Sequence, residues 1–143
     1  MLKLTELAPS DTQADDILTL PFESRQKSRL PACTDGGVKV GLFLQRGQYL
    51  RSGVVLTGNE KFRVMIKAAP ETLSVVRTDD ALLFARLCYH LGNRHIALQI
   101  LPGELRFLSD HVLDAMVEGL GGVVIHDILP FEPEAGAYKS HGH

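Results

Sequence analysis

The sequence predicts an α+β fold in two parts, a small antiparallel β-domain followed by a ferredoxin-like βαββαβ domain. No stretch before residue 75 repeats apolar residues with a helical period, and short alternating stretches fill that half instead. After residue 75, two stretches carry apolar residues at i, i+3, i+4 and i+7, each between strand-like segments. The segment Pro70-Glu71-Thr72 is typical of a junction. We therefore place the β-domain at residues 1–72 and the second domain at residues 73–131.

The first domain is predicted to consist of short strands and turns, largely antiparallel. Asp35-Gly36-Gly37 is typical of a hairpin turn that leads directly into a strand. Gly47 and Gly53 interrupt the chain further on. The expected strands are Asp16–Phe22, Val38–Leu44, Val54–Leu56 and Phe62–Ile66.

The second domain is predicted to begin with a strand over Leu73–Arg77 and a helix after it. Thr78 is a suitable N-cap, and the acidic residues Asp79 and Asp80 would then lie in the first turn, where the helix dipole favours them. Gly92 is expected to end the helix. Its apolar face consists of Phe84, Leu87, Cys88 and Leu91.

The remaining elements complete the order β-α-β-β-α-β, the split βαβ arrangement. A strand over Ile96–Ile100 is followed by the turn Pro102-Gly103 and a strand over Glu104–Leu108. Ser109 or Asp110 would cap the second helix. That helix carries the apolar stripe Leu113, Met116, Val117 and Leu120, ends at Gly121-Gly122, and precedes a strand over Val123–Leu129. Residues 132–143 have little to bury, and we expect a flexible tail.

Composition and missing motifs exclude several classes of function. A net charge of −2 gives no basic surface for nucleic acid, and no apolar run is long enough to span a membrane. The first residues lack the apolar region of a signal peptide, so we expect a cytoplasmic protein. Cys33 and Cys88 lie far apart without a CxxC pattern. Since no GxSxG, P-loop or HExxH is present, we expect no enzyme.

Two rival functions remain weak on the same grounds. A metal-independent hydrolase or binding domain on this fold would need a phosphate-cradling loop after the first strand, where the acidic segment Arg77-Thr78-Asp79-Asp80 stands instead. An RNA-binding module would need aromatic side chains on a central strand, and Ile96–Ile100 has none.

Histidine and charge are divided unevenly along the chain. All six histidines lie within residues 90–143. Residues 1–74 hold ten Lys and Arg against eight Asp and Glu, whereas residues 75–143 hold five against nine. Imidazole is the commonest side-chain ligand of zinc, nickel and copper, and an acidic surrounding favours a divalent cation. The second half is therefore predicted to bind a metal ion.

His95 is the first candidate ligand, because it follows the expected helix stop in a polar connection and should lie near the surface. One imidazole is a poor site, since a metal ion usually needs several donors. A two-fold dimer would supply a second His95 close to the axis. The alternative is that the ring merely hydrogen-bonds a loop.

The other histidines are weaker candidates. His141 and His143 could bend back to add donors, or they could belong to a solvated end of the chain. Asp110 and His111 form a possible second site, and an exposed first helical turn is at least as good an interpretation. We expect His90 to be structural, near a helix end that favours a cation. His126 falls in the last strand without an identifiable partner.

Several segments resemble the UreE family of urease accessory proteins. They are Tyr89–His95, which ends in Gly-Asn-Arg-His, Asp110–Leu113, and Leu129–Tyr138, which reads Leu-Pro-Phe-Glu-Pro-Glu-Ala-Gly-Ala-Tyr. Ser28-Arg29, Gly41–Leu44 and Arg46-Gly47 match the first domain of the family. The resemblance covers nearly the whole chain.

The resemblance implies a homodimeric nickel metallochaperone that carries Ni(II) as cargo to apo-urease. It implies an N-terminal β-domain that binds partner protein and a ferredoxin-like domain that binds metal and dimerises. His95 maps onto the interface ligand, and His141 and His143 are the candidates for the C-terminal ligands. Urease apoprotein and its accessory GTPase are the implied partners, with no role for nucleic acid or membrane. Cu(II) or Zn(II) could compete in vitro.

Two departures from the family limit this implication. The chain offers only His-Gly-His where many members carry a long histidine-rich tail, and Phe107-Leu108-Ser109 lacks a histidine that some members have. In the first domain, Arg25, Lys27 and Arg29 form a basic stretch that could steer an acidic partner, or could be a solvated strand end.

Overall fold

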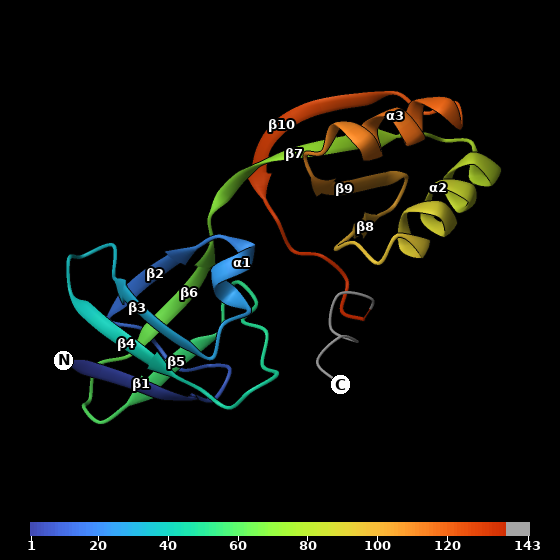
Figure 1. Ribbon diagram of the computed structural model, residues 1–143. Coiled ribbons are helices and arrows are strands. Elements are labelled where there is room, and N and C mark those ends of the chain that lie inside the picture. The colour runs from blue at the N-terminus through green and yellow to red at the C-terminus, as the bar shows by residue number, and fades with distance from the viewer. Residues whose placement is uncertain (137–143) are drawn as a thin grey trace. The chain divides into compact units, whose positions relative to one another are not determined.

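The computed structural model describes residues 1–136 and is shown in Figure 1. The chain forms two compact units, of which the first ends at Ala69 and the second begins at Pro70. The division lies slightly ahead of the expected one, because Pro70 is already the first residue of a long strand. Proline is tolerated there, since the first residue of a strand can lack an N–H donor.

The first unit holds a six-stranded sheet in the order β2-β6-β5-β1-β4-β3. Its elements are β1 (Leu2–Leu7), β2 (Asp16–Leu20), α1 (Phe22–Arg25), β3 (Arg29–Cys33), β4 (Lys39–Phe43), β5 (Val55–Gly58) and β6 (Val64–Ala68). Two of the pairings, β1 with β4 and β2 with β6, are parallel. The sheet is therefore mixed, and the expectation of a largely antiparallel domain needs this correction.

The core of the first unit follows from alternation along the strands. Leu4, Leu42 and Ile66 are buried on one face, whereas their strand neighbours point the other way. The hairpin between β3 and β4 turns at the expected segment, where Gly37 adopts φ 92°, a conformation that favours glycine. Three elements escaped prediction: β1, β3 and the single-turn helix α1.

Arg25, at the end of α1, is buried rather than exposed. Its Nε donates to the Leu20 carbonyl at 3.0 Å, and its Nη1 donates to the Tyr49 hydroxyl at 2.6 Å and to the Leu50 carbonyl at 3.3 Å. The guanidinium thus ties the helix to the loop before β5. Because Arg25 is enclosed, the basic stretch expected around it is not a continuous exposed surface.

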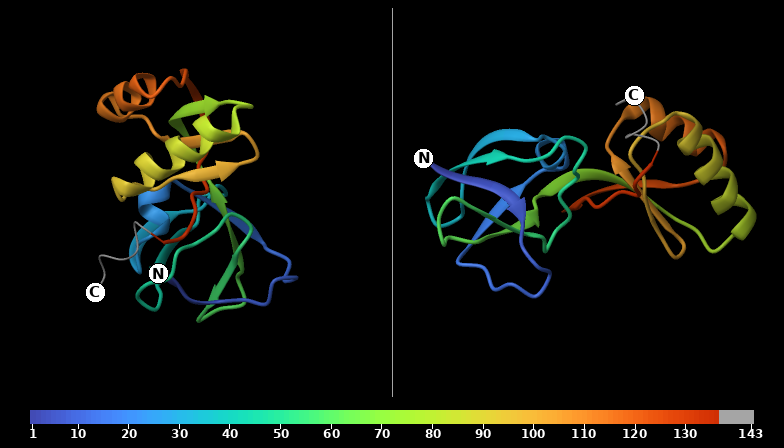
Figure 2. Two further views of the ribbon diagram at one scale, coloured as in Figure 1. Left: turned by 90° about the vertical axis from the view of Figure 1, so that its right-hand side faces the viewer. Right: turned by 90° about the horizontal axis from the view of Figure 1, so that it is seen from below.

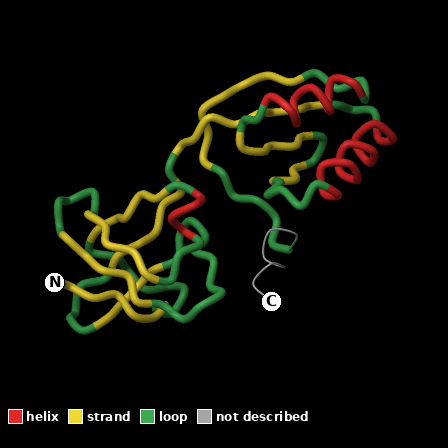
Figure 3. The backbone as a smooth tube through the Cα atoms, in the orientation of Figure 1, coloured by secondary structure: helices red, strands yellow, loops and turns green. Residues whose placement is uncertain are grey.

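The second unit holds a four-stranded sheet in the order β10-β7-β9-β8, in which every neighbouring pair is antiparallel. Its elements are β7 (Pro70–Arg77), α2 (Ala81–Asn93), β8 (Gln99–Leu101), β9 (Glu104–Leu108), α3 (His111–Gly119) and β10 (Val124–Pro130). The predicted sequence of strand, helix, strand, strand, helix and strand is present. Figure 3 shows α2 and α3 of this unit, and the short α1 of the other, in red.

Both helices pack on one face of the second sheet, as Figure 2 also shows. Leu87 and Leu91 of α2, with Leu113 and Val117 of α3, are buried together with Phe107 of β9. These four helical residues belong to the two apolar stripes that the sequence predicted. The packing therefore confirms the periodicity, although Phe84, Cys88, Met116 and Leu120 are only partly buried.

The first helix differs from prediction at both of its ends. Asp80 is the N-cap rather than Thr78, and its Oδ1 accepts hydrogen bonds from the N–H groups of Leu82 and Leu83. The helix continues through Gly92 to Asn93. The next strand is confined to Gln99–Leu101, so much of the strand expected at Ile96–Ile100 is loop.

Candidate metal site

His95 lies exposed in the loop between α2 and β8, and its backbone is left-handed with φ 56°. It is the one non-glycine residue with positive φ in the described chain. Its N–H donates to the Gly92 carbonyl at 3.0 Å, which closes the last turn of the helix. Histidine is among the residues enriched in this conformation. His95 therefore takes the position after the helix that glycine usually occupies.

The C-terminal segment lies beside the chain that follows His95. The Glu134 N–H donates to the Leu98 carbonyl at 2.8 Å, and the Glu132 N–H donates to Oε1 of Gln99 at 3.0 Å. Phe131 is buried. Residues 132–134 thus lie beside Leu98 and Gln99, at the start of β8. Leu98 is only three residues after His95 in the sequence.

Donors for a complete metal site are not assembled within one chain over residues 1–136. No group of three or more His, Cys, Asp or Glu side chains in that range could hold a metal ion. His141 and His143 lie outside the described residues, so their predicted role stays a prediction. A site centred on His95 needs donors from those residues or from a second chain.

Asp110 has a structural role that the sequence allowed as an alternative. It is the N-cap of α3, and its Oδ1 accepts from the N–H groups of Val112 at 2.8 Å and Leu113 at 3.2 Å. His111 is the first helical residue and is exposed. A carboxylate at this end of the helix is favoured by the helix dipole. The predicted pairing of Asp110 with His111 as a metal site remains a prediction.

His126 has a partner that sequence reasoning did not find. Its Nε2 lies 2.8 Å from Oδ2 of Asp114 on α3. The other oxygen of Asp114 accepts a hydrogen bond from Ser74 at 2.6 Å. Ser74 and His126 are direct neighbours across β7 and β10. This arrangement depends on the register of β7 with β10. No local pattern in the sequence pairs a strand residue with a helix residue twelve positions earlier.

His90 and the two cysteines are further side chains that could donate to a metal. His90 is half-buried and its ring meets that of Tyr89 edge-on, with centroids 5.1 Å apart. Burial raises the pKa of the Cys88 thiol, which disfavours the thiolate that a metal would need. Cys33 is an exposed free cysteine of the first unit.

Glu104 on β9 is bound between two arginines. Its oxygens accept from Nε of Arg77 at 2.8 Å and from Nε of Arg106. Partial burial acts to raise the pKa of this carboxyl, but the hydrogen bonds and charges of Arg106 and Arg77 outweigh it and hold the pKa below its ordinary value. This acid therefore serves an ion network rather than a metal site.

No helix in residues 1–136 is long and apolar enough to cross a membrane.

Comparison with known proteins gives a consistent result over both units. Residues 3–69 match the family model described as UreE urease accessory protein, N-terminal domain, and residues 71–143 match the C-terminal domain of the same description. A urease accessory protein UreE of Alkalilimnicola ehrlichii is 54% identical over 138 residues, which cover 96% of this chain and 85% of that protein.

Two further relatives carry the same name. The protein of Tolumonas auensis is 52% identical over 145 residues, covering 98% of this chain and 77% of its own length. That of Escherichia coli O157:H7 is 48% identical over 148 residues, covering the whole of this chain and 95% of its own length.

Proposed function

Because this chain belongs to the UreE family of urease accessory proteins, we propose that it is a nickel metallochaperone that delivers Ni(II) to apo-urease during maturation. The observation that carries the proposal is the position of His95. Its imidazole is exposed on a closed helix end, and the segment that leads to the C-terminal histidines is hydrogen-bonded to the chain just after it. The name of the relatives supports the role in urease maturation.

The proposed mechanism is transfer of nickel by stepwise ligand exchange. Neutral imidazole is a borderline donor that suits Ni(II), whereas thiolate would favour Cu(I) and zinc. Ligands from His141 and His143 would leave one at a time, so that donors of the receiving protein could replace them. The Irving–Williams order implies that Cu(II) competes in vitro, with Zn(II) as a weaker competitor.

A homodimer is proposed to complete the site, with His95 of each chain near a two-fold axis. Exposed large apolar side chains support association through the second unit. Of the ten in residues 1–136, eight lie there: Leu82, Tyr89, Ile100, Leu108, Val112, Val123, Ile125 and Ile128. A dimer would remove such surface from water.

The same proposal assigns the two units different tasks in the cytoplasm. The second would be a ferredoxin-like domain that binds metal and dimerises, supported by its element order and antiparallel sheet. The first would contact urease apoprotein or its accessory GTPase. Catalysis, nucleic acid and membrane have no part in this proposal.

Equilibrium dialysis of the full-length protein against Ni(II) tests the central site. We expect the tightest class of sites to hold close to one ion per two chains, because a shared axial site serves both protomers. His95→Ala should abolish this class while the protein remains folded and dimeric. His126→Gln is the matched control, since it also removes one exposed imidazole and should leave the class intact. Full retention of tight nickel by a folded His95→Ala protein contradicts the proposal.

A further inference from the structure

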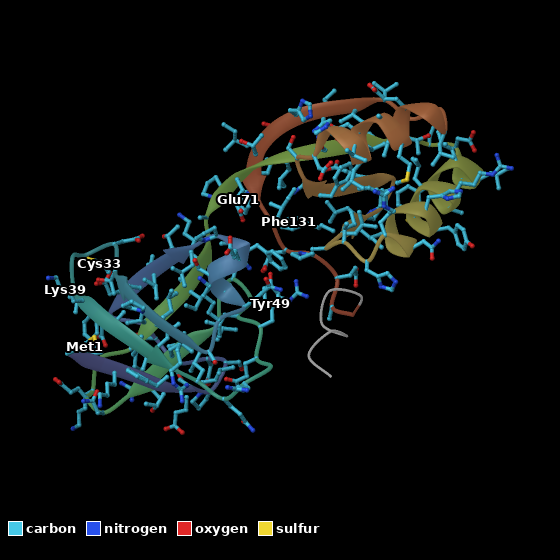
Figure 4. The ribbon with its side chains drawn as sticks, viewed as in Figure 1. Met1, Cys33, Lys39, Tyr49, Glu71 and Phe131 are labelled. Atoms are coloured by element: carbon cyan, nitrogen blue, oxygen red, sulfur yellow. The ribbon has the colours of Figure 1, made fainter. Side chains whose placement is uncertain are left out.

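A small apolar dent lies on the outer face of the first sheet, where β1, β4 and β3 are neighbours. Its lining includes Met1, Pro31, Gly41 of β4 and Phe43. Its volume is about 170 Å³. Since an apolar cavity of about 150 Å³ accommodates a benzene ring, the dent has room for one aromatic or branched aliphatic side chain. Figure 4 shows Met1 together with Lys39 and Cys33 on this unit.

Gly41 is covered by the side chains of Phe43 and Met1. A Cβ at this position would lie 2.9 Å from Cε2 of Phe43 and 3.0 Å from Cε of Met1, too close for both to keep their places, so glycine allows these two walls of the dent to pack against the strand. Gly41 stands between Lys3 of β1 and Pro31 of β3 in the sheet register. Its strand neighbours Val40 and Leu42 are buried in the core on the opposite face.

Positive charge surrounds the dent. Nζ of Lys3 and Cζ of Arg29 each lie 5.5 Å from the centre of the Phe43 ring, a distance that permits cation–π attraction. The Arg29 guanidinium is held in place by Nη1, which donates to the Leu44 carbonyl at 2.9 Å. Lys39 is exposed two residues before Gly41 on the same strand face. No acidic residue lines the dent.

We propose that this dent is a docking site for a protein segment that presents one apolar side chain flanked by carboxylates. The apolar side chain would enter the dent beside Pro31 and Phe43, and the carboxylates would meet Lys3, Arg29 and Lys39. The inference deepens the proposed function, since it gives the first unit a partner of defined chemistry. It also moves the basic docking surface away from the buried Arg25.

The partner is expected to bind the sheet face rather than its edge. β3 is the edge strand on this side, and Pro31 at its middle has no N–H to donate to an added strand. Recognition by side chains over the dent avoids this obstacle. Because the dent is apolar and cations surround it, the site favours an acidic peptide with one apolar side chain over a uniformly charged polyanion.

Fluorescence anisotropy with a labelled pentapeptide, Glu-Glu-Leu-Glu-Glu, tests the site on the full-length protein. We expect saturable binding that weakens as salt screens the charges. Lys3→Glu should weaken it roughly tenfold. Lys67→Glu is the matched control, because Lys67 is an exposed lysine on β6, separated from β1 by β5, and it should change binding little. Equal losses in the two variants would show a general charge effect and overturn the proposal.

The apolar part of the site is tested separately. The peptide Glu-Glu-Ala-Glu-Glu and the variant Gly41→Ala should each weaken binding severalfold, the first by removing the apolar side chain and the second by displacing the Met1 and Phe43 side chains that line the dent. If the alanine peptide binds as well as the leucine peptide, the dent is not used. Preferential binding of phosphatidylglycerol vesicles, lost in Lys3→Glu, would mark a membrane surface instead and reject the peptide site.

The outcome is separable from that of nickel delivery. Dialysis of Lys3→Glu and Gly41→Ala against Ni(II) should give wild-type metal content, because His95 belongs to the other unit. If the protein binds nickel normally but not the peptide, only the proposed docking site is overturned. If it binds the peptide but no nickel, only the proposed metallochaperone function is overturned.

Discussion

Oδ2 of Asp114 on α3 lies 2.8 Å from Nε2 of His126 on the edge strand β10. The same carboxylate accepts a hydrogen bond from Ser74, which is fully buried on β7. One helical side chain therefore joins two neighbouring strands to the helix above them. An ionised carboxylate only accepts, so a hydrogen bond in this contact requires the form of His126 that carries a proton on Nε2.

Asp114→Ala should lower the free energy of unfolding by about 1–3 kcal/mol, because it leaves the buried Ser74 hydroxyl without its acceptor. Urea denaturation of the full-length protein measures the loss. Glu118→Ala, which removes an exposed acid from the same helix, is the control and should change stability by less than about 0.5 kcal/mol. The double variant Ser74→Ala/Asp114→Ala should lose less than the sum of the single losses. Strict additivity would contradict the coupling.

Asp80→Ala should destabilise the protein by about 1 kcal/mol, because the Leu82 and Leu83 N–H groups lose the carboxylate that caps them. Thr78→Ala is the informative comparison, since the Thr78 hydroxyl accepts only from the Asp80 N–H outside the helix. Thermal melting should therefore rank Asp80→Ala below Thr78→Ala. The reverse order would restore Thr78 as the cap.

The two helices of the second unit were predicted well because the spacing of apolar residues indicates which side chains are buried. The residues Leu87, Leu91, Leu113 and Val117 are buried as the two stripes require. Helix ends were predicted less well, since Thr78 and Asp80 are both suitable caps and only the backbone decides between them. Gly92 was a reasonable stop, yet His95 adopts the left-handed conformation instead.

The first unit was harder to predict from sequence because its strands are short and pair at long range. Parallel pairing of β1 with β4 joins segments far apart in the chain, and no local pattern encodes it. The burial of Arg25 was equally hidden, since a basic side chain near other basic residues normally lies in solvent. The partners of His126 depend on the register of β7 with β10, which also lies beyond local sequence.

Acid should weaken the first unit through Asp16. Hydrogen bonds from the Thr34 hydroxyl and from the N–H groups of Ile17 and Gly36 lower the pKa of this carboxyl. Since the folded pKa lies below the unfolded one, the stabilisation is present above the ordinary pKa of 3.8 and is lost as the pH falls through the folded pKa.

The difference in melting temperature between wild type and Asp16→Asn should therefore be largest near pH 7 and shrink below about pH 4. Asp11→Asn, at an exposed position in the preceding loop, should follow the wild-type profile. A difference that stays constant from pH 7 to pH 3 would show that the Asp16 charge contributes nothing to the effect.

Truncation after Tyr138 should weaken nickel binding and speed nickel release without changing the melting of the apo-protein. It removes His141 and His143, while the hydrogen bonds of Glu132 and Glu134 to the start of β8 remain. Stopped-flow transfer of Ni(II) to a chelator measures release, and calorimetry measures melting. Unchanged affinity and release would assign the tail no part in the site. A lower melting temperature would mean that the tail stabilises the fold.

His95→Gly separates the metal role of this residue from its place in the helix end. Glycine adopts φ near +56° without the steric cost that a side chain carries, so the variant should be as stable as wild type or more stable by up to about 1 kcal/mol. Tight nickel binding should nevertheless disappear.

His95→Asn is the companion variant, because asparagine tolerates the left-handed region and keeps a polar side chain without imidazole. Both measurements are made on one preparation, by urea denaturation and by equilibrium dialysis. If His95→Gly is clearly destabilised, the imidazole ring contributes to the stability of the fold although it is exposed. If it is stable and still binds nickel tightly, the residue is only a helix terminator.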